Sequence, residues 1–182
     1  RFDDIGYLKQ ALDDILRVME DAFRSGVLLN LLWDQYDDPQ QAEADCEEAS
    51  VGFLHDGLMV GVLDSVRYTC FDVLRVLSDR FASGELISYA VRPQSKASGY
   101  FILNFSYESD IKERVISIIR NYTERLGNSW NIGLSYCQGG IMRLGQIFTQ
   151  AKSACRYISK QTKGGNVALY SDIEMKISSV QL

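Results

Sequence analysis

The stretch "ELISYAVRPQSKASGYFILNFSY", Glu85 to Tyr107, decides the fold of this chain. Its two ends, 85–91 and 99–107, are rich in β-forming side chains, and the segment between them contains Pro93. Such a pattern is typical of two strands joined by a hairpin turn. We therefore expect two adjacent antiparallel strands near the middle of the chain, with the other elements arranged before and after them.

The segments on either side of this hairpin alternate between strand and helix patterns. "LMVGVLDSV" (58–66) is a nearly continuous apolar run, as expected of a strand that is covered on both faces. Helical spacing is found at 68–81, 109–127 and 142–161, and further strand-like runs at 130–137 and 166–173. The predicted order is β-α-β-β-α-β followed by an added α-β unit. This is an α+β fold with a ferredoxin-like or cyclase-like split β-α-β core.

A long helix is predicted before this core, from residue 5 to about residue 36. Its apolar side chains alternate spacings of three and four, which is the pattern of a coiled-coil seam. The seam residues are Ile5, Leu8, Leu12, Ile15 and Met19. A single narrow seam favours pairing with the same helix of a second copy, so we expect a homodimer; packing on its own domain is the alternative. The wider apolar segment 27–33 is expected to dock on the globular body, and Pro39 to end the helix.

The chain is accordingly divided into three parts. Residues 1–36 are expected to form a signalling and dimerisation helix, 37–50 an acidic linker, and 51–182 the globular domain. The acidic residues of the linker, which has no Lys or Arg, are Asp37, Asp38, Glu43, Asp45, Glu47 and Glu48. Such a run is typical of a solvated segment, and the net charge of −5 argues against direct DNA contact by this part of a protein.

Residue types that bind metals or act as nucleophiles are few and dispersed. The four cysteines form no CxxC pair and His55 is the single histidine, so neither a zinc site nor a Ser-His-Asp or Cys-His set is supported. Cys70, Cys137 and Cys155 lie among apolar neighbours and are expected to be small core residues in a reducing cytoplasm. His55 is expected in a surface turn. We expect no metal and no cofactor.

The closing part of the chain carries a more specific pattern. In "GLSYCQGGIMRLGQIFTQAKSACRYISKQTKGGNVALYSDIE", Gly133 to Glu174, a Gly-Leu-Ser strand precedes a helix with Gln-Ala and a further Ala, then a glycine and an exit of the form Y-x-D-I. The matching residues are Gly133, Leu134, Ser135, Gln150, Ala151, Ala154, Gly165, Tyr170, Asp172 and Ile173, whereas Phe148 and Cys155 depart from the pattern. Residues 52–175 thus resemble the degenerate GGDEF-like domain, of nucleotidyl-cyclase fold, of AraC-type transcriptional regulators.

This resemblance implies a bacterial signal-transduction protein of the sensor or two-component kind. The domain would relay a signal to a helix-turn-helix DNA-binding domain further along the parent chain, and DNA would be contacted through that separate domain. The N-terminal "DDIGYLKQALDDIL" (3–16) is similar to the end of a HAMP signalling helix, which normally follows a transmembrane segment. It implies a membrane-anchored parent with this domain in the cytoplasm. The start at Arg1, inside an amphipathic pattern, likewise indicates a piece of a longer protein.

An active diguanylate cyclase, the enzyme of this fold, needs paired metal-binding carboxylates at its first strand and a GG[DE]EF turn between its central strands. Here the turn is "RPQSKASGY" (92–100), without Gly-Gly or an acid, and Asp64 stands at one metal position while Val66 occupies the other. We therefore expect no enzyme, and interpret Asp64 as a cap of the next helix. The glycine pairs at 139–140 and 164–165 are interpreted as a turn and as the end of a helix, respectively, rather than as phosphate-binding loops.

Two further hypotheses from other classes stay open. In one, the degenerate cleft binds a nucleotide or metabolite without turning it over, and Asp64, Arg67 and Arg92 line that cleft. In the other, the acidic surface docks a partner protein.

Overall fold

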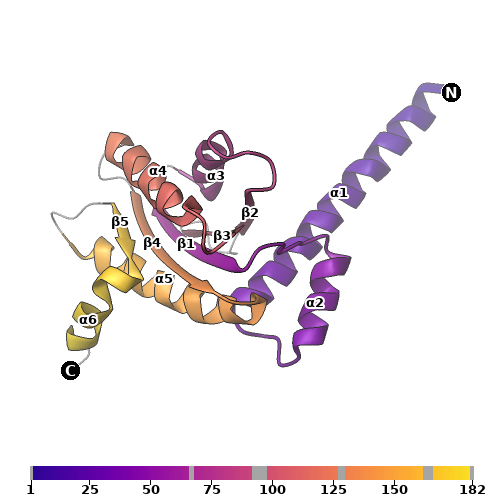
Figure 1. The fold of residues 1–182 in the computed structure, drawn as a ribbon. Coiled ribbons are helices and arrows are strands. Elements are labelled where there is room, and N and C mark those ends of the chain that lie inside the picture. Colours follow the sequence, from indigo (N-terminus) through magenta and orange to yellow (C-terminus); the bar gives the residue numbers. More distant parts are fainter. Residues whose placement is uncertain (1, 66–67, 92–97, 127–129, 162–165, 181–182) are drawn as a thin grey trace.

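Figure 1 shows a computed structural model of the chain, which describes residues 2–65, 68–91, 98–126, 130–161 and 166–180. The helices are α1 (Phe2–Leu32), α2 (Pro39–Glu48), α3 (Cys70–Ser78), α4 (Ile111–Leu126), the short 3-10 helix η1 (Ile141–Arg143), α5 (Leu144–Ser159) and α6 (Tyr170–Val180). The strands are β1 (Gly57–Ser65), β2 (Leu86–Val91), β3 (Ser98–Phe105), β4 (Trp130–Gln138) and β5 (Val167–Leu169).

The strands of the described residues form one mixed sheet in the order β2-β3-β1-β4-β5. β2 and β3 pair antiparallel from Leu86 opposite Phe105 to Val91 opposite Tyr100, so the predicted pairing of these strands is confirmed. β1 runs antiparallel to β3 and β4, whereas β5 lies parallel to β4 and is reached through α5. Parallel neighbours need such a crossover. The predicted α+β class, with a split β-α-β core, an added α-β unit and a long N-terminal helix, is confirmed.

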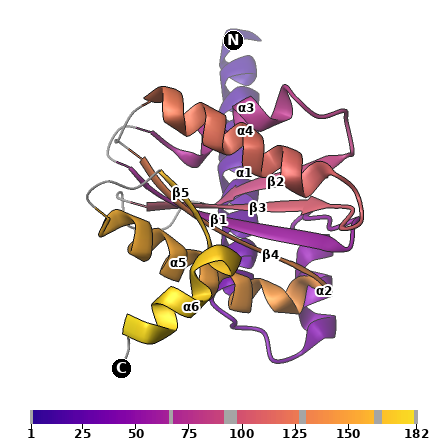
Figure 2. The same cartoon turned by 60° about the vertical axis from the view of Figure 1, so that its left-hand side comes forward.

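Helices cover both faces of the sheet, as Figure 2 shows. α3 and α4 lie on one face, and α5, α2 and the C-terminal end of α1 on the other. β1 contributes to both cores, because alternate side chains point to opposite faces: Val60 and Val62 join one cluster, and Met59 and Leu63 the other. Burial on both faces explains the continuous apolar run of this strand.

Helix α5 approaches β4 closely through small residues. A Cβ atom added to Gly133 would lie 2.1 Å from the carbonyl oxygen of Ala151 and 2.3 Å from the backbone nitrogen of Cys155. Ala151 and Ala154 are fully buried. The Gly-Leu-Ser and Gln-Ala pattern is therefore a packing pattern, since any larger residue at position 133 would force the helix away from the sheet.

The segment expected to be an acidic linker is largely a helix. The Asp38 carboxylate accepts a hydrogen bond from the Gln40 backbone N–H at 2.9 Å, and Pro39 occupies the first turn of α2, where a missing N–H is tolerated. Ala42 and Cys46 are buried in the cluster that also holds the end of α1. This corrects the expectation of a solvated linker over 37–50: Asp38-Pro39 begins a helix, and α1 already ends at Leu32.

The last predicted strand, 166–173, is shorter than expected. β5 covers Val167–Leu169, and the chain turns directly into α6 at Tyr170. Asp172 in the first turn of α6 suits the positive end of the helix dipole. Ile173 is buried together with Ala154 and Ile158 of α5, so the Y-x-D-I exit is the start of a helix that packs on α5.

Candidate functional site

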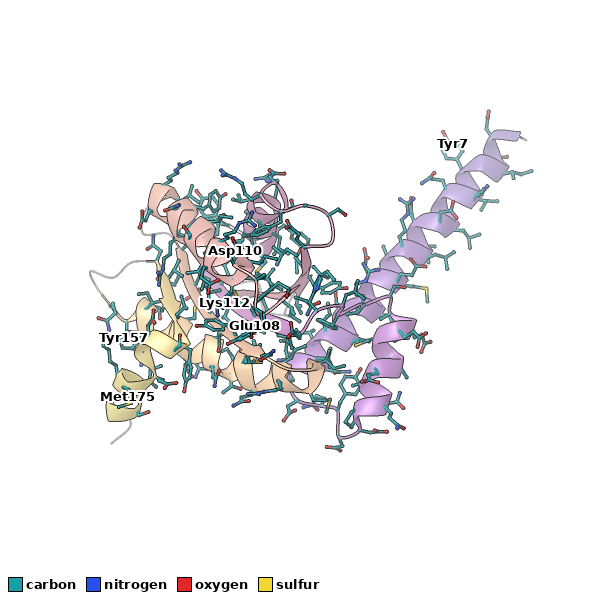
Figure 3. All side chains as sticks on the ribbon, in the orientation of Figure 1. Tyr7, Glu108, Asp110, Lys112, Tyr157 and Met175 are labelled. Atoms are coloured by element: carbon teal, nitrogen blue, oxygen red, sulfur yellow. The ribbon has the colours of Figure 1, made fainter. Side chains whose placement is uncertain are left out.

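Helix α1 projects from the body along most of its length. Its residues from Asp3 to Phe23 are exposed, and burial begins near Val27. Figure 1 shows this N-terminal half running away from the sheet, and Figure 3 shows its side chains, Tyr7 among them, extending where no other element lies. Although α1 is long, neither it nor another helix in the described ranges is apolar enough over sufficient length to cross a membrane.

The predicted seam lies on this projecting half. Its residues, Ile5, Leu8, Leu12, Ile15 and Met19, are 58–67% exposed. Burying one such side chain is worth roughly 1.5–3 kcal/mol, so a row of them in contact with water is unfavourable. Contiguous exposed apolar rows mark interaction surfaces. The sequence predicts this spacing, and the structure adds that the seam residues are not covered by the part of the chain that it describes.

The seam and the face that packs on the body lie on nearly opposite sides of the helix. At 3.6 residues per turn, the centre of the seam is about 150° around the axis from the centre of the buried face. That buried face consists of Val27, Leu28, Leu31 and Leu32. One helix can therefore contact its own body and a second helix at the same time. Sequence reasoning missed Leu16, Val18 and Phe23, exposed residues that widen the seam and occupy its flanking heptad positions.

The base of α1 is held firmly by the rest of the domain. Leu28 and Leu32 join a buried cluster with Ala42 of α2 and with Leu144 and Phe148 of α5. The Arg24 guanidinium donates through Nε to the carbonyl oxygen of Ala49 at 3.4 Å, next to the end of α2. The projecting half is thus continuous with a segment that packs against both α2 and α5.

Tyr36 fastens the connection between α1 and α2. Its hydroxyl donates to Oδ2 of Asp45 at 2.9 Å. Burial, and then the hydrogen bond to Asp45, raise the pKa of Tyr36 to about 12. The hydroxyl therefore stays protonated at neutral pH and keeps this hydrogen bond to a carboxylate.

Of the three residues expected to line a vestigial cleft, the structure describes Asp64 alone. Asp64 is an exposed residue near the end of β1, opposite Ser98 and Asn131. Arg67 and Arg92 lie outside the described residues. The interpretation of Asp64 as the cap of the next helix is wrong: α3 has Thr69 at its N-cap, and the Asp72 carboxylate accepts from the Thr69 backbone N–H at 2.8 Å.

The glycines and cysteines behave largely as packing and turn residues. Gly139 has a φ of +152°, which supports the turn interpretation, while the pair at 164–165 lies outside the described residues. Cys70 and Cys155 are buried core residues as predicted, and Cys137 is half-buried. Burial, with the nearby Asp64 charge second, raises the pKa of Cys155 to about 11, and burial also raises that of Cys70, to about 12. Neither thiol is activated as a nucleophile.

Neither a cluster of metal-binding side chains nor a comparison with known proteins points to a different site. Among the described residues, no three His, Cys, Asp or Glu side chains converge as metal ligands would. A scan against protein-family models finds no match for this chain, and a search of curated proteins finds no relative. The resemblance to GGDEF-like domains therefore rests on the motif residues alone. The exposed seam of α1 is the surface on which a functional hypothesis is best founded.

Proposed function

We propose that this chain is the non-catalytic, cytoplasmic regulatory domain of a bacterial AraC-type transcriptional regulator. In this proposal α1 pairs with α1 of a second copy through the seam. A signal changes the tilt or register of that pair, and the body relays the change to a helix-turn-helix domain elsewhere in the parent protein. The observation that carries the proposal is the uncovered apolar seam on a helix whose other end is embedded in the core.

The position of α5 supports the relay. Leu144 and Phe148, in its N-terminal half, pack in the cluster that holds α1. Ala154 and Ile158, in its C-terminal half, pack with Ile173 of α6. Figure 1 shows α5 spanning the body between these two helices. A single helix thus contacts the proposed input at one end and the last described helix at the other.

The pairing is tested by sedimentation equilibrium on the wild type and on Leu12→Asp. The wild type is expected at twice the 20.6 kDa mass of the chain, and Leu12→Asp at the single mass, because a carboxylate in a closed seam is strongly unfavourable. Tyr7→Asp is the matched control: Tyr7 is 77% exposed, lies on the same helix and faces away from the seam. An unchanged mass for Leu12→Asp would end the pairing hypothesis.

The relay is tested separately by hydrogen exchange. If α5 transmits the state of the helix pair, Leu12→Asp should change amide protection in α6, whereas Tyr7→Asp should not. If Leu12→Asp is monomeric but exchange in α6 is unchanged, the pairing hypothesis is supported and the relay hypothesis is contradicted. The non-catalytic part is tested by incubation with GTP and Mg²⁺, for which we expect no cyclic dinucleotide.

A further inference from the structure

A cavity of about 620 Å³ lies between α2, the segment that follows it and the turn between β4 and η1. Sites that bind drug-sized molecules have volumes of roughly 300–1,000 Å³, so this cavity is large enough for a small organic ligand. The walls come from three parts of the chain that are distant in sequence: 43–47, 50–58 and 139–141. This cavity lies apart from the seam of α1 and from Asp64.

The floor of the cavity is apolar. Cys46, Val51 and Leu58 are buried there, and Phe53 and Ile141 are half-buried beside them. The ring of Phe53 packs against Tyr89, with 5.7 Å between the ring centroids and an interplanar angle of 58°. An aromatic ring held in this way offers an apolar surface and the negative face that attracts cations.

Several polar groups of the cavity are already engaged within the protein. The Tyr89 hydroxyl accepts from the Gly52 N–H at 2.8 Å and lies 3.0 Å from the Gly52 carbonyl oxygen, to which it donates. The Gly139 N–H donates to the carbonyl oxygen of Asp56 at 2.9 Å. His55 Nε2 lies 2.7 Å from the carbonyl oxygen of Gly84 and, because a carbonyl only accepts, that nitrogen carries the proton and donates.

The cavity also carries two carboxylates. Glu43 and Glu47 stand one turn apart on α2, and both line the cavity. Within the described ranges neither forms an ion pair. Burial, and then the charges of Asp45 and Glu43, raise the pKa of the Cys46 thiol between them to about 11, so the thiol stays neutral. Among the described residues that line the cavity there is no lysine or arginine.

We propose that this cavity binds a small organic monocation, a protonated amine or amidinium carried on an apolar body. The cationic group is bound by Glu43 and Glu47 and by the face of Phe53, and the apolar part lies on Val51 and Ile141. The same carboxylates disfavour phosphates and other anions. Nucleotides, the ligands of the fold that the sequence resembles, are therefore disfavoured in this cavity by their negative charge.

The location of this site gives the ligand a route to α1. The buried residues of the cavity floor belong to the same cluster as Val27 and Leu31. A bound ligand would therefore contact residues that pack against the base of α1. A ligand that binds only the folded domain raises its melting temperature, and the rise continues with the logarithm of the ligand concentration above Kd. Binding of the cation requires neither pairing of α1 nor the relay, so a binding measurement alone tests it.

The experiment is calorimetric titration with 2-phenylethylammonium, using 3-phenylpropionate as an anion of matched shape. We expect saturable binding of the cation at millimolar or lower concentration, and affinity for the anion weaker by about tenfold or more. The double variant Glu43→Gln/Glu47→Gln should lose about tenfold in affinity for the cation. Glu48→Gln should not, since Glu48 is an exposed acid of the same helix that does not line the cavity.

A steric variant separates shape from charge. A Cβ atom at Gly140 meets nothing within 4 Å, and its φ of −86° suits any residue, so Gly140→Leu should fold and add an apolar side chain to the wall of the cavity. It should weaken binding of the cation while both carboxylates remain. Equal affinity for cation and anion, undiminished binding by the double Gln variant, or no saturable binding of 2-phenylethylammonium and benzamidinium by the wild type would each overturn the proposal.

Discussion

The two halves of helix α1 carry the same kind of side chain in opposite surroundings. In the C-terminal half, Val27, Leu28, Leu31 and Leu32 are at most 3% exposed, whereas the five seam residues of the N-terminal half are at least 58% exposed. Both rows have helical spacing and similar hydropathy. An apolar row therefore predicts that a helix face will be covered, but it does not specify what covers it.

The two rows also differ in what their loss should cost. A leucine in the buried half is surrounded by the chain's own core, so its removal leaves a cavity in every molecule. A leucine in the exposed half has no such surroundings in the single chain, so its removal should matter only where two copies meet. Matched substitutions in the two halves therefore measure the comparison directly.

The largest expected effect is the difference between Leu28→Ala and Leu8→Ala. Leu28 is fully buried, and its truncation should lower the free energy of unfolding by about 2–5 kcal/mol. Leu8 is 66% exposed, and its truncation should change the free energy of unfolding of dilute protein by about 0.5 kcal/mol or less. Urea unfolding followed by tryptophan fluorescence measures both.

Protein concentration sharpens this comparison. The cost of Leu28→Ala should be the same at any concentration, whereas a cost of Leu8→Ala should appear as concentration rises, because association adds stability by mass action. Equal losses in dilute protein would mean that the projecting half is part of the body's cooperative unit, contrary to its exposure.

A second, smaller effect concerns Tyr36 at the base of α1. Removing its hydrogen bond to Asp45 in Tyr36→Phe should cost about 0.5–1.5 kcal/mol at neutral pH. Because the pKa of Tyr36 is about 12 in the folded protein against 10.0 for an ordinary tyrosine, the folded form holds its proton where the unfolded form has lost it. The stability linked to this group is complete below pH 10 and is lost as pH rises through 10 to 12.

Unfolding measurements from about pH 8 to about pH 11 should therefore show a shallower alkaline loss in Tyr36→Phe than in the wild type. The raised cysteine pKa values add a loss of their own in this range in both proteins, since all the cysteines are present in each. Tyr7→Phe, in the exposed half, is the matched control and should follow the wild type. Parallel stability curves for Tyr36→Phe and the wild type would show that the hydrogen bond of Tyr36 does not stabilise the base of α1.

The sequence indicated the sheet well because its signals are local. The strands of the central hairpin, the continuous run of β1 and the helical spacing on α4 and α5 each require only neighbouring residues, and the observed order follows from them. The helix α2 was missed because Pro39 is compatible both with the end of one helix and with the first turn of the next. Asp38, which caps α2, was counted only as charge.

The candidate site was predictable in part, for a related reason. Spacing identifies the seam, because Leu8 and Leu12 repeat on one face whatever surrounds them. Spacing does not predict whether such a residue is exposed, since Leu28 has the same spacing and is buried by residues of α2 and α5. The cavity beside Phe53 was not predictable, because its walls come from segments about ninety residues apart that carry no common pattern. Asp64 was misinterpreted because the capping residues, Thr69 and Asp72, lie further along the chain.

The smallest expected effect uses one glycine from each half of α1. Gly6 and Gly26 both lie within the helix, and a Cβ atom added at either meets nothing within 4 Å. Replacing a glycine inside a helix by alanine stabilises that helix by about 0.5–1 kcal/mol. Gly26 directly precedes the buried residues, so Gly26→Ala should raise the free energy of global unfolding by this amount.

Gly6→Ala should act differently, because a projecting helical segment opens and closes without the body. It should increase helical ellipticity in the native protein and leave the urea midpoint of tryptophan fluorescence unchanged. The pair thus compares the same substitution in an independent and in a cooperative part of one helix. If Gly6→Ala raised the urea midpoint as much as Gly26→Ala does, the projecting half would unfold together with the core. The exposed seam would then belong to the cooperative unit of the body and not to a segment that is free to bind a second copy.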